Sequence, residues 1–279
     1  MRPSSKSKRR RASRLGGGKI GGRSPLILKV TFIMVLLCVL TLLYFRWFSS
    51  INQPQSTDGL SVNVSRVAIV DAIGVTKPNP EFLKSVKEVL EKTGLKVDVY
   101  EGKNVTIDLL RNIGGYGLII LRVHSAIDPK YGFLYLFSAE EFDETEYDDK
   151  FSEEKRFGAI REGVTFENER YFALRADLLG YLRPDGLNGS TIILMGCNGT
   201  GSKHALNRLF ERGVKSVIAW DGYVDLEYTD KITLNLIKVV YEGGLKFSDA
   251  VKKIMEENGP DPIYKSKLEY LTKPFNQQS

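Results

Sequence analysis

Residues 117–123 read GLIILRV and are followed by His124; residues 191–195 read TIILM and are followed by Gly196 and Cys197. Both are short apolar runs, which is typical of strands buried on both faces of a parallel sheet. Similar runs occur at residues 66–72, 96–100 and 216–220. They alternate with segments whose apolar spacing predicts helices, at residues 81–92, 105–113, 203–212, 229–241 and 247–257. This alternation predicts an α/β fold with a mainly parallel sheet flanked by helices.

The predicted domain covers residues 66–279. Short hairpin strands are expected at residues 133–137, 158–160 and 171–173. Residues 139–149 carry seven carboxylates, and we expect a solvated loop there. Calcium binding by this stretch stays open, because its spacing matches no specific ligand pattern.

The net charge of +6 is unevenly distributed along the chain. Residues 1–29 contain ten Lys or Arg and no Asp or Glu, so the other residues carry 34 acidic and 30 basic side chains. A basic nucleic-acid footprint on the folded part is therefore not expected. No phosphate-binding glycine motif follows a strand, which also disfavours a nucleotide site.

Residues 26–48 form an apolar run that is interrupted only by Lys29 and Arg46, near its ends. Such a run is long enough to cross a membrane as a helix, and end-placed basic side chains can reach the interface. A cleaved signal peptide is the alternative, although its apolar part is usually only about 7–15 residues long.

The basic side chains before the anchor orient it with the N-terminus in the cytoplasm. The sequence thus predicts a basic cytoplasmic tail (1–25), a single transmembrane anchor (26–48), a polar stalk (49–65) and an extracytoplasmic domain at the cell membrane. Four Asn-x-Ser/Thr sequons agree with an outside location; they begin at Asn63, Asn104, Asn188 and Asn198.

His124 and Cys197 are the candidate reactive side chains. Each follows an apolar strand, and active sites of open parallel sheets form beyond the carboxyl ends of the strands. Cys38 lies in the predicted anchor, and His204 is expected at the surface or as a helix cap. Singly, a cysteine or a histidine is more often structural, but the joint placement favours a thiol nucleophile with a histidine base.

The turn after Cys197, Asn-Gly-Thr-Gly-Ser, leads into a predicted helix. Glycines let a backbone bend sharply and present N–H groups, and a helix N-terminus stabilises negative charge. These features suit a thiolate and the oxyanion of an acyl-transfer intermediate. One cysteine and two histidines without close spacing make no specific zinc cluster, so neither a metal nor a cofactor is expected.

These motifs resemble clan CD cysteine peptidases, which include caspases, clostripain-like enzymes, separase and the bacterial CHAT domains. The resemblance rests on His-Ser after one strand, Met-Gly-Cys-Asn-Gly after another, and the downstream segments Ala-Trp-Asp-Gly-Tyr-Val and Phe-Ser-Asp-Ala-Val. It covers roughly residues 117–256. Two positions depart from the family pattern: Ser125 stands where Gly is usual, and Gly196 where Ala, Ser or Asp is often found.

The resemblance implies a caspase-like domain that cleaves a peptide or protein substrate. Cys197 would be the nucleophile, His124 the general base and acid, and the amides of Ser125 and Cys197 the oxyanion hole. Asp221, or else Asp225, would select Arg or Lys at P1, although a turn or cap role is equally open for Asp221. The alternative function is a catalytically inactive caspase-like domain that binds a partner at the cell surface.

Overall fold

The computed structural model describes residues 63–183 and 186–273, together with Met34 and Thr41. Within these residues, six strands form one sheet in the order β10-β9-β8-β3-β1-β2. Neighbouring strands are parallel except β10, which is antiparallel to β9 and closes one edge. The strands are β1 (Asn63–Asp71), β2 (Lys96–Glu101), β3 (Tyr116–Arg122), β8 (Thr191–Leu194), β9 (Ser216–Trp220) and β10 (Leu268–Thr272).

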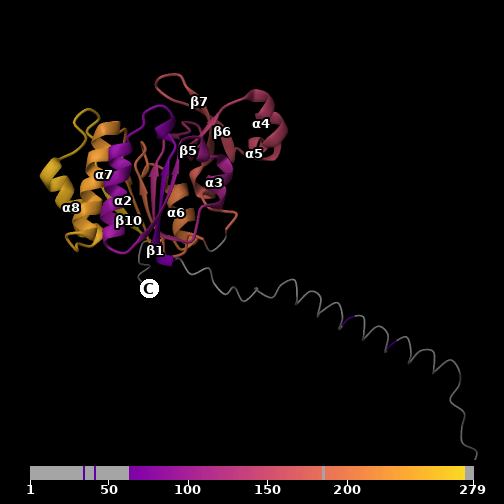
Figure 1. Cartoon of the computed structure of the whole chain (residues 1–279). Helices are drawn as coiled ribbons and strands as arrows, with labels where there is room; N and C mark the ends of the chain where they lie inside the picture. Colours follow the sequence, from indigo (N-terminus) through magenta and orange to yellow (C-terminus); the bar gives the residue numbers. More distant parts are fainter. Residues whose placement is uncertain (1–33, 35–40, 42–62, 184–185, 274–279) are drawn as a thin grey trace, which may run out of the picture. The chain divides into compact units, whose positions relative to one another are not determined.

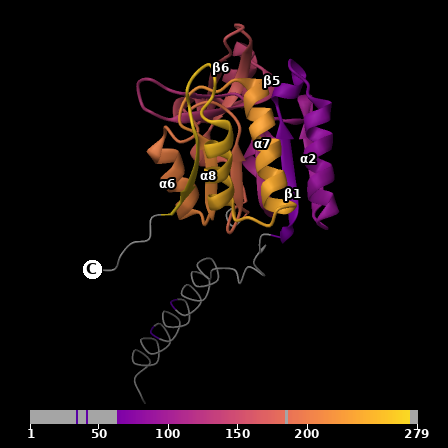
Figure 2. The ribbon, with the colours of Figure 1, turned by 90° about the vertical axis from the view of Figure 1, so that its left-hand side faces the viewer.

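Helices cover both faces of this sheet because its strands are apolar on both sides. Ile69, Ile120 and Ile193 face one layer, and their neighbours Val70 and Ile119 face the other. The first layer contains α2 (Pro80–Lys92), α7 (Leu226–Tyr241) and α8 (Phe247–Asn258). The second contains α3 (Ile107–Asn112) and α6 (Lys203–Glu211). Figures 1 and 2 show α2, α7 and α8 together on one side of the sheet.

A second, antiparallel sheet has the order β4-β5-β7-β6. Its core residues, among them Leu136, Phe172 and Leu174, belong to the cluster that also holds α3 and α6. Its first strand begins directly after His124, so this sheet adjoins the carboxyl end of β3. The elements of this part are β4 (Ser125–Ile127), β5 (Leu134–Glu141), α4 (Glu144–Lys150), α5 (Ser152–Arg156), β6 (Ile160–Val164) and β7 (Arg170–Arg175). Three short 3-10 helices complete the described elements: η1 (Ile73–Val75), η2 (Gly102–Asn104) and η3 (Ala176–Leu178).

The predicted α/β architecture with a mainly parallel, helix-flanked sheet is confirmed. The acidic stretch 139–149 differs from the expected loop, because it holds the end of β5 and most of α4. Asp143 caps that helix by accepting a hydrogen bond from the Glu146 N–H at 2.8 Å. Acidic side chains in the first turn of a helix are favourable, so a run of carboxylates can begin a helix here.

The predicted tail and anchor, and the stalk as far as residue 62, lie outside the described residues, apart from Met34 and Thr41, which are helical. The last three stalk residues, 63–65, belong to β1 instead, which corrects the predicted boundary. Over the described part of the chain, no helix has both the length and the apolar character to cross a membrane. The sheets and helices from β1 to β10 all fall in one unit, Asp58–Ser279.

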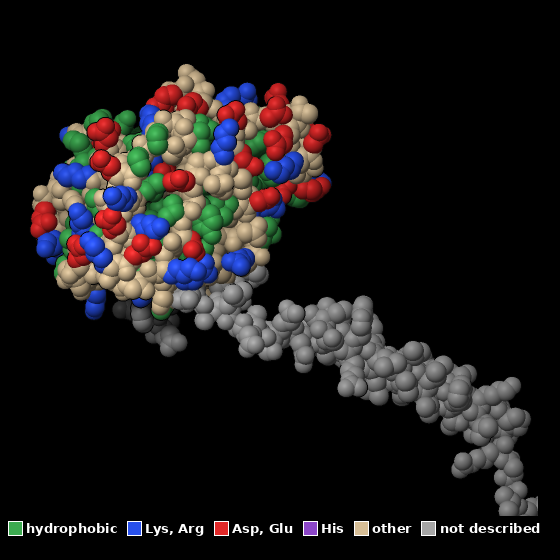
Figure 3. Space-filling model, in the orientation of Figure 1, with side chains coloured by type: hydrophobic (Ala, Val, Ile, Leu, Met, Phe, Trp, Pro, Cys, Tyr) green, Lys and Arg blue, Asp and Glu red, His purple; other side chains and the backbone are tan. Residues whose placement is uncertain are grey.

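Acidic and basic side chains are interspersed on the face of this unit seen in Figure 3. On α2 and α8, acidic and basic side chains pair one helical turn apart: Lys84 with Glu88, Lys87 with Glu91, and Lys253 with Glu257. Such pairs on an exposed helix each contribute only about 0.3–0.5 kcal/mol.

Candidate active site

Cys197 lies in a tight turn that follows β8. The strand pairing continues just beyond β8, where the Met195 N–H donates to Leu121 O at 2.9 Å. The turn is then held to the end of β9, because the Asn198 N–H donates to Gly222 O at 2.8 Å. Asn198 takes a positive φ of 56°, a conformation that asparagine tolerates better than most residues. The thiol is therefore presented on a fixed backbone at the carboxyl end of the sheet.

His124 follows β3, the strand that pairs with β8. Burial lowers the pKa of His124 below its ordinary value; nearby Glu167 opposes this shift, and Lys77 and Arg122 add to it. Lys77 and Glu167 form an ion pair with each other, and both side chains are about half exposed. The imidazole is thus neutral around pH 7 and available as a proton acceptor.

The two side chains line one pocket with a volume of about 140 Å³. The pocket is formed by the turns after β3 and β8, by β4 and β5, by the end of β6 and the turn after it, and by the loop after β9. Its lining residues are His124, Ser125, Ala126, Phe137, Val164, Thr165, Phe166, Cys197 and Tyr223. The juxtaposition that parallel topology predicts for His124 and Cys197 is therefore present.

The thiol is in its neutral state in this environment. Burial raises the pKa of Cys197, and the carboxylate of Asp261 adds to that increase. The helix that follows the turn starts only at Lys203, six residues further on, so the expected stabilisation of a thiolate by a helix N-terminus is remote. The sulfur lies 4.0 Å from Val224 O, and no hydrogen bond joins it to His124 in the described structure.

Ser125 connects the histidine turn to the cysteine turn. Its hydroxyl donates to Cys197 O at 2.6 Å. Gly196 lies directly against it: a Cβ at this glycine would be 2.3 Å from Ser125 Oγ and 2.5 Å from Val123 O. The hydroxymethyl group at 125 thus occupies the space that a side chain at 196 would need, which relates the two departures from the clan CD pattern to each other.

The backbone N–H of Ser125 points away from its neighbouring strand. The Phe137 N–H donates to His124 O, and the Asp128 N–H donates to Phe133 O. The backbone N–H and C=O groups of residues 124, 126 and 128 therefore point towards β5. Along an antiparallel pair, the backbone groups of every second residue point towards the partner strand, so the N–H of Ser125 points away from β5. The Cys197 N–H has no acceptor among the described residues. Both amides are thus unbonded donors beside the pocket, as the predicted oxyanion hole requires.

Asp221 and Asp225, the predicted specificity residues, do not line the pocket. The exposed Asp221 accepts a hydrogen bond from the Lys267 N–H at 2.7 Å and so joins the end of β9 to the segment before β10. Asp225 is the N-cap of α7 and accepts from the Tyr228 N–H at 3.0 Å. Both carboxylates therefore have structural partners in the backbone.

Asp261 is a buried carboxylate near the thiol that the sequence analysis did not single out. It is 0% exposed and accepts hydrogen bonds from the N–H groups of Asp225, Ile263 and Tyr264 at 2.6–2.8 Å. Three backbone donors satisfy a buried carboxylate without a cation. The sequence signal for this structure is Gly-Pro-Asp-Pro at residues 259–262, because these residue types favour turns in which the Asp side chain accepts backbone N–H groups.

Arg122 is a second residue that the sequence analysis did not assign to the site. It is 1% exposed, and its guanidinium donates to Asp230 at 2.8 and 2.9 Å, to Asp71 at 2.9 Å and to Lys77 O at 3.2 Å. Burial raises the pKa of Asp71 despite this positive charge, and the second oxygen of Asp71 has no hydrogen-bond partner among the described residues. A charge inside an apolar strand signals such a network, because buried charges need partners.

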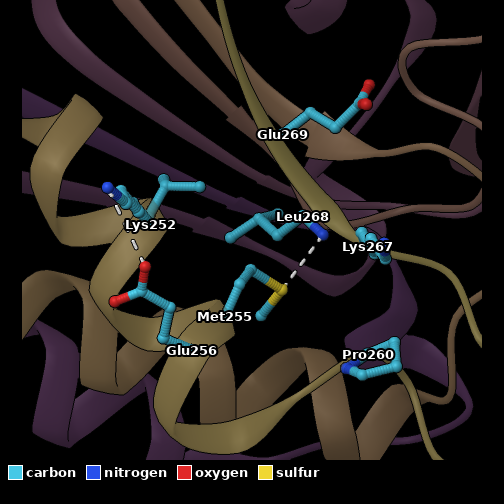
Figure 4. Close-up of a pocket in the computed structure, with 8 residues that line it drawn as sticks. Lys252, Met255, Glu256, Pro260, Lys267, Leu268 and Glu269 are labelled. Atoms are coloured by element: carbon cyan, nitrogen blue, oxygen red, sulfur yellow. Dashed lines mark hydrogen bonds and ion pairs between the residues drawn. The ribbon is translucent and has the colours of Figure 1, made fainter.

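A larger pocket of about 330 Å³ lies between α8 and β10 (Figure 4). Lys252 and Glu256 pair there at 3.9 Å, and the Leu268 N–H donates to the Met255 sulfur. Its lining contains no cysteine, histidine or serine, so it lacks a nucleophile and a base; the lining residues are Val251, Lys252, Met255, Glu256, Pro260, Lys267, Leu268 and Glu269. Size alone therefore does not make it the reactive site.

His204 lies on α6, away from both pockets. It is half exposed and contacts Asp177 at 3.4 Å and the ring of Phe133. No group of three or more His, Cys, Asp or Glu side chains within the described ranges is arranged to hold a metal ion.

Comparison with protein-family models and with curated proteins gives no match to this chain. The resemblance to clan CD peptidases therefore stays a prediction.

Proposed function

We propose that this chain is a membrane-anchored, extracytoplasmic cysteine endopeptidase with a caspase-like domain and a Cys197–His124 dyad. The observation that carries the proposal is the shared pocket: a thiol and a neutral imidazole lie at the ends of two adjacent parallel strands. The two unbonded amides beside them support the same chemistry.

In the first half of the reaction, the sulfur of Cys197 attacks the carbonyl carbon of the scissile bond while its proton passes to His124. A C–S bond forms, and the carbonyl oxygen becomes an oxyanion that accepts hydrogen bonds from the N–H groups of Ser125 and Cys197. The C–N bond then breaks, its electron pair goes to the nitrogen, and the leaving amine takes the proton from His124.

In the second half, water attacks the thioester carbon and gives a proton to His124. The C–S bond breaks, the sulfur regains a proton from His124, and the peptide leaves as a carboxylic acid. Because burial favours the neutral thiol and the neutral imidazole, we expect the thiol proton to move during the attack of the sulfur rather than before it.

The alternative function is an inactive caspase-like domain that binds a partner at the cell surface. The neutral thiol, which faces Val224 O rather than His124, is the observation that favours it. The P1 preference for Arg or Lys through Asp221 or Asp225 stays a prediction, and neither side chain lies in the pocket lining.

Labelling of Cys197 by an electrophilic peptide decides between the two functions. We expect the full chain to be labelled, Cys197→Ala to abolish labelling, and His124→Ala to slow it by roughly 10²-fold or more, the usual contribution of a general base. His204→Ala is the matched control, because that half-exposed histidine lies outside the pocket and its loss should leave the rate unchanged. Equal rates in the wild type and the His124 variant would reject the dyad.

A further inference from the structure

No Asp, Glu, Lys or Arg side chain lines the pocket that contains the dyad. Of its lining residues, Ala126, Phe137, Val164 and Phe166 are apolar. Phe137 is buried, whereas Val164 and Phe166 are 53% and 76% exposed. An exposed apolar wall next to a nucleophile presents a surface that a substrate side chain can cover.

Four carboxylates that lie close in space or in sequence to the dyad or the pocket lining already have partners. Asp261 accepts three backbone hydrogen bonds, and Glu167 is paired with Lys77. Asp221 and Asp225 accept backbone N–H groups of Lys267 and Tyr228. A buried cationic side chain requires an available anion, and these four carboxylates are already engaged.

The apolar wall continues outward as a row of exposed aromatic rings. Phe166, from the turn after β6, lies 5.6 Å from Tyr223, and Tyr223 lies 5.9 Å from Tyr264, measured between ring centroids. Tyr223 and Tyr264 are 49% and 46% exposed, and Ile263, next to Tyr264 in the sequence, is 63% exposed. Contiguous exposed apolar groups of this kind mark binding surfaces.

We propose that the pocket binds an uncharged apolar or aromatic side chain adjacent to the scissile bond, with the Phe166–Tyr223–Tyr264 row binding further apolar residues of the same extended peptide. This inference rests on the proposed peptidase function and names its substrate class. An apolar side chain gains by leaving water in this pocket, whereas a charged one would lose hydration without gaining a partner.

Digestion of a mixed peptide library by the full-length chain in detergent tests the proposal, with the cleaved bonds identified by mass spectrometry. This readout covers the residues on both sides of each cleaved bond. We expect Leu, Met, Phe or Val to exceed Lys, Arg, Asp and Glu by roughly tenfold or more at one of the two positions. Enrichment of charged residues, or equal acceptance of all side chains, would overturn the inference and leave the peptidase proposal intact. A lack of any Cys197-dependent cleavage would overturn both.

Val164→Asp provides an independent test, because it places a carboxylate in the pocket wall at an exposed position of an edge strand. This variant should shift the preference towards Lys and Arg. Phe157→Asp is the matched control: Phe157 is also exposed, at 66%, but does not line the pocket, so its variant should keep the wild-type preference. An unchanged preference in the Val164 variant would count against the assignment of this pocket.

Discussion

Ser125 and Gly196 meet where the histidine turn contacts the cysteine turn. The serine hydroxyl holds Cys197 O, and the glycine leaves room for that hydroxyl. Each residue therefore depends on the other, and their effects on stability should be coupled.

Gly196→Ala should destabilise the domain by about 1–3 kcal/mol, because the new methyl group would overlap Ser125 Oγ and Val123 O. Ser125→Gly removes the nearer of these contacts and leaves the one to Val123 O, so the double variant should lose less stability than the sum of the two single losses. Urea unfolding of the wild type, both single variants and the double variant measures this coupling. Strictly additive effects would contradict it.

The dyad should also determine the pH dependence of peptide hydrolysis. Protonated His124 cannot accept the thiol proton, so kcat/KM should fall as the pH drops through the pKa of His124. Because burial lowers that pKa, the acid limb should lie below about pH 6.5, the ordinary value for histidine. Ionisation of Cys197 removes the proton that His124 passes to the leaving amine, so kcat/KM should also fall at alkaline pH, and the raised pKa of Cys197 should place this limb above the ordinary range of a cysteine.

Two substitutions should move the acid limb in opposite directions. Glu167→Gln removes a negative charge that raises the pKa of His124, so the limb should shift to lower pH. Lys77→Gln removes a positive charge that lowers the pKa of His124, so the acid limb should shift to higher pH. Shifts of the same sign in both variants would argue against His124 as the titrating base.

At the scale of elements, Arg122 ties three parts of the fold together just before His124. It joins the end of β3 to the end of β1 through Asp71, to α7 through Asp230, and to the turn before α2 through Lys77 O. The backbone of the histidine turn is therefore fixed from three directions.

Arg122→Met should lower the free energy of unfolding by about 3–5 kcal/mol, because it leaves Asp71 and Asp230 buried without their cation. Arg208→Met is the control, since Arg208 pairs with Glu211 at an exposed position and should change stability by less than about 1 kcal/mol. Thermal or urea unfolding monitored by circular dichroism gives both values. A loss below 1 kcal/mol for Arg122→Met would contradict the role of the network.

Sequence patterns predicted the buried strands and amphipathic helices well, because a strand buried on both faces must be apolar throughout. They missed β10, an edge strand that begins with the buried Leu268 and contains the charged, partly buried Glu269. They also missed β4, which has only three residues. His124 and Cys197 were predictable because parallel topology brings the ends of adjacent strands together. Val164 and Phe166 were not, because they reach the pocket only through the packing of the second sheet.

At the scale of the whole molecule, the proposed peptidase domain lies outside the cell and is attached to the membrane by its N-terminal anchor. Removal of residues 1–48 should release the chain from membranes, whereas the full chain should resist carbonate extraction. In intact cells, external protease should digest a tag at the C-terminus and spare one at the N-terminus. Protection of the C-terminal tag would contradict the proposed orientation.

The contact between Ser125 and Gly196 also constrains how such a site can evolve. Glycine after the histidine would remove the 2.3 Å contact with Ser125 Oγ and so reduce the crowding of a side chain before the cysteine, whereas the 2.5 Å contact with Val123 O would remain. The two positions should therefore covary among descendants of a common ancestor. Relatives of this chain are best sought by the paired pattern, serine after the histidine together with glycine before the cysteine, rather than by either motif alone.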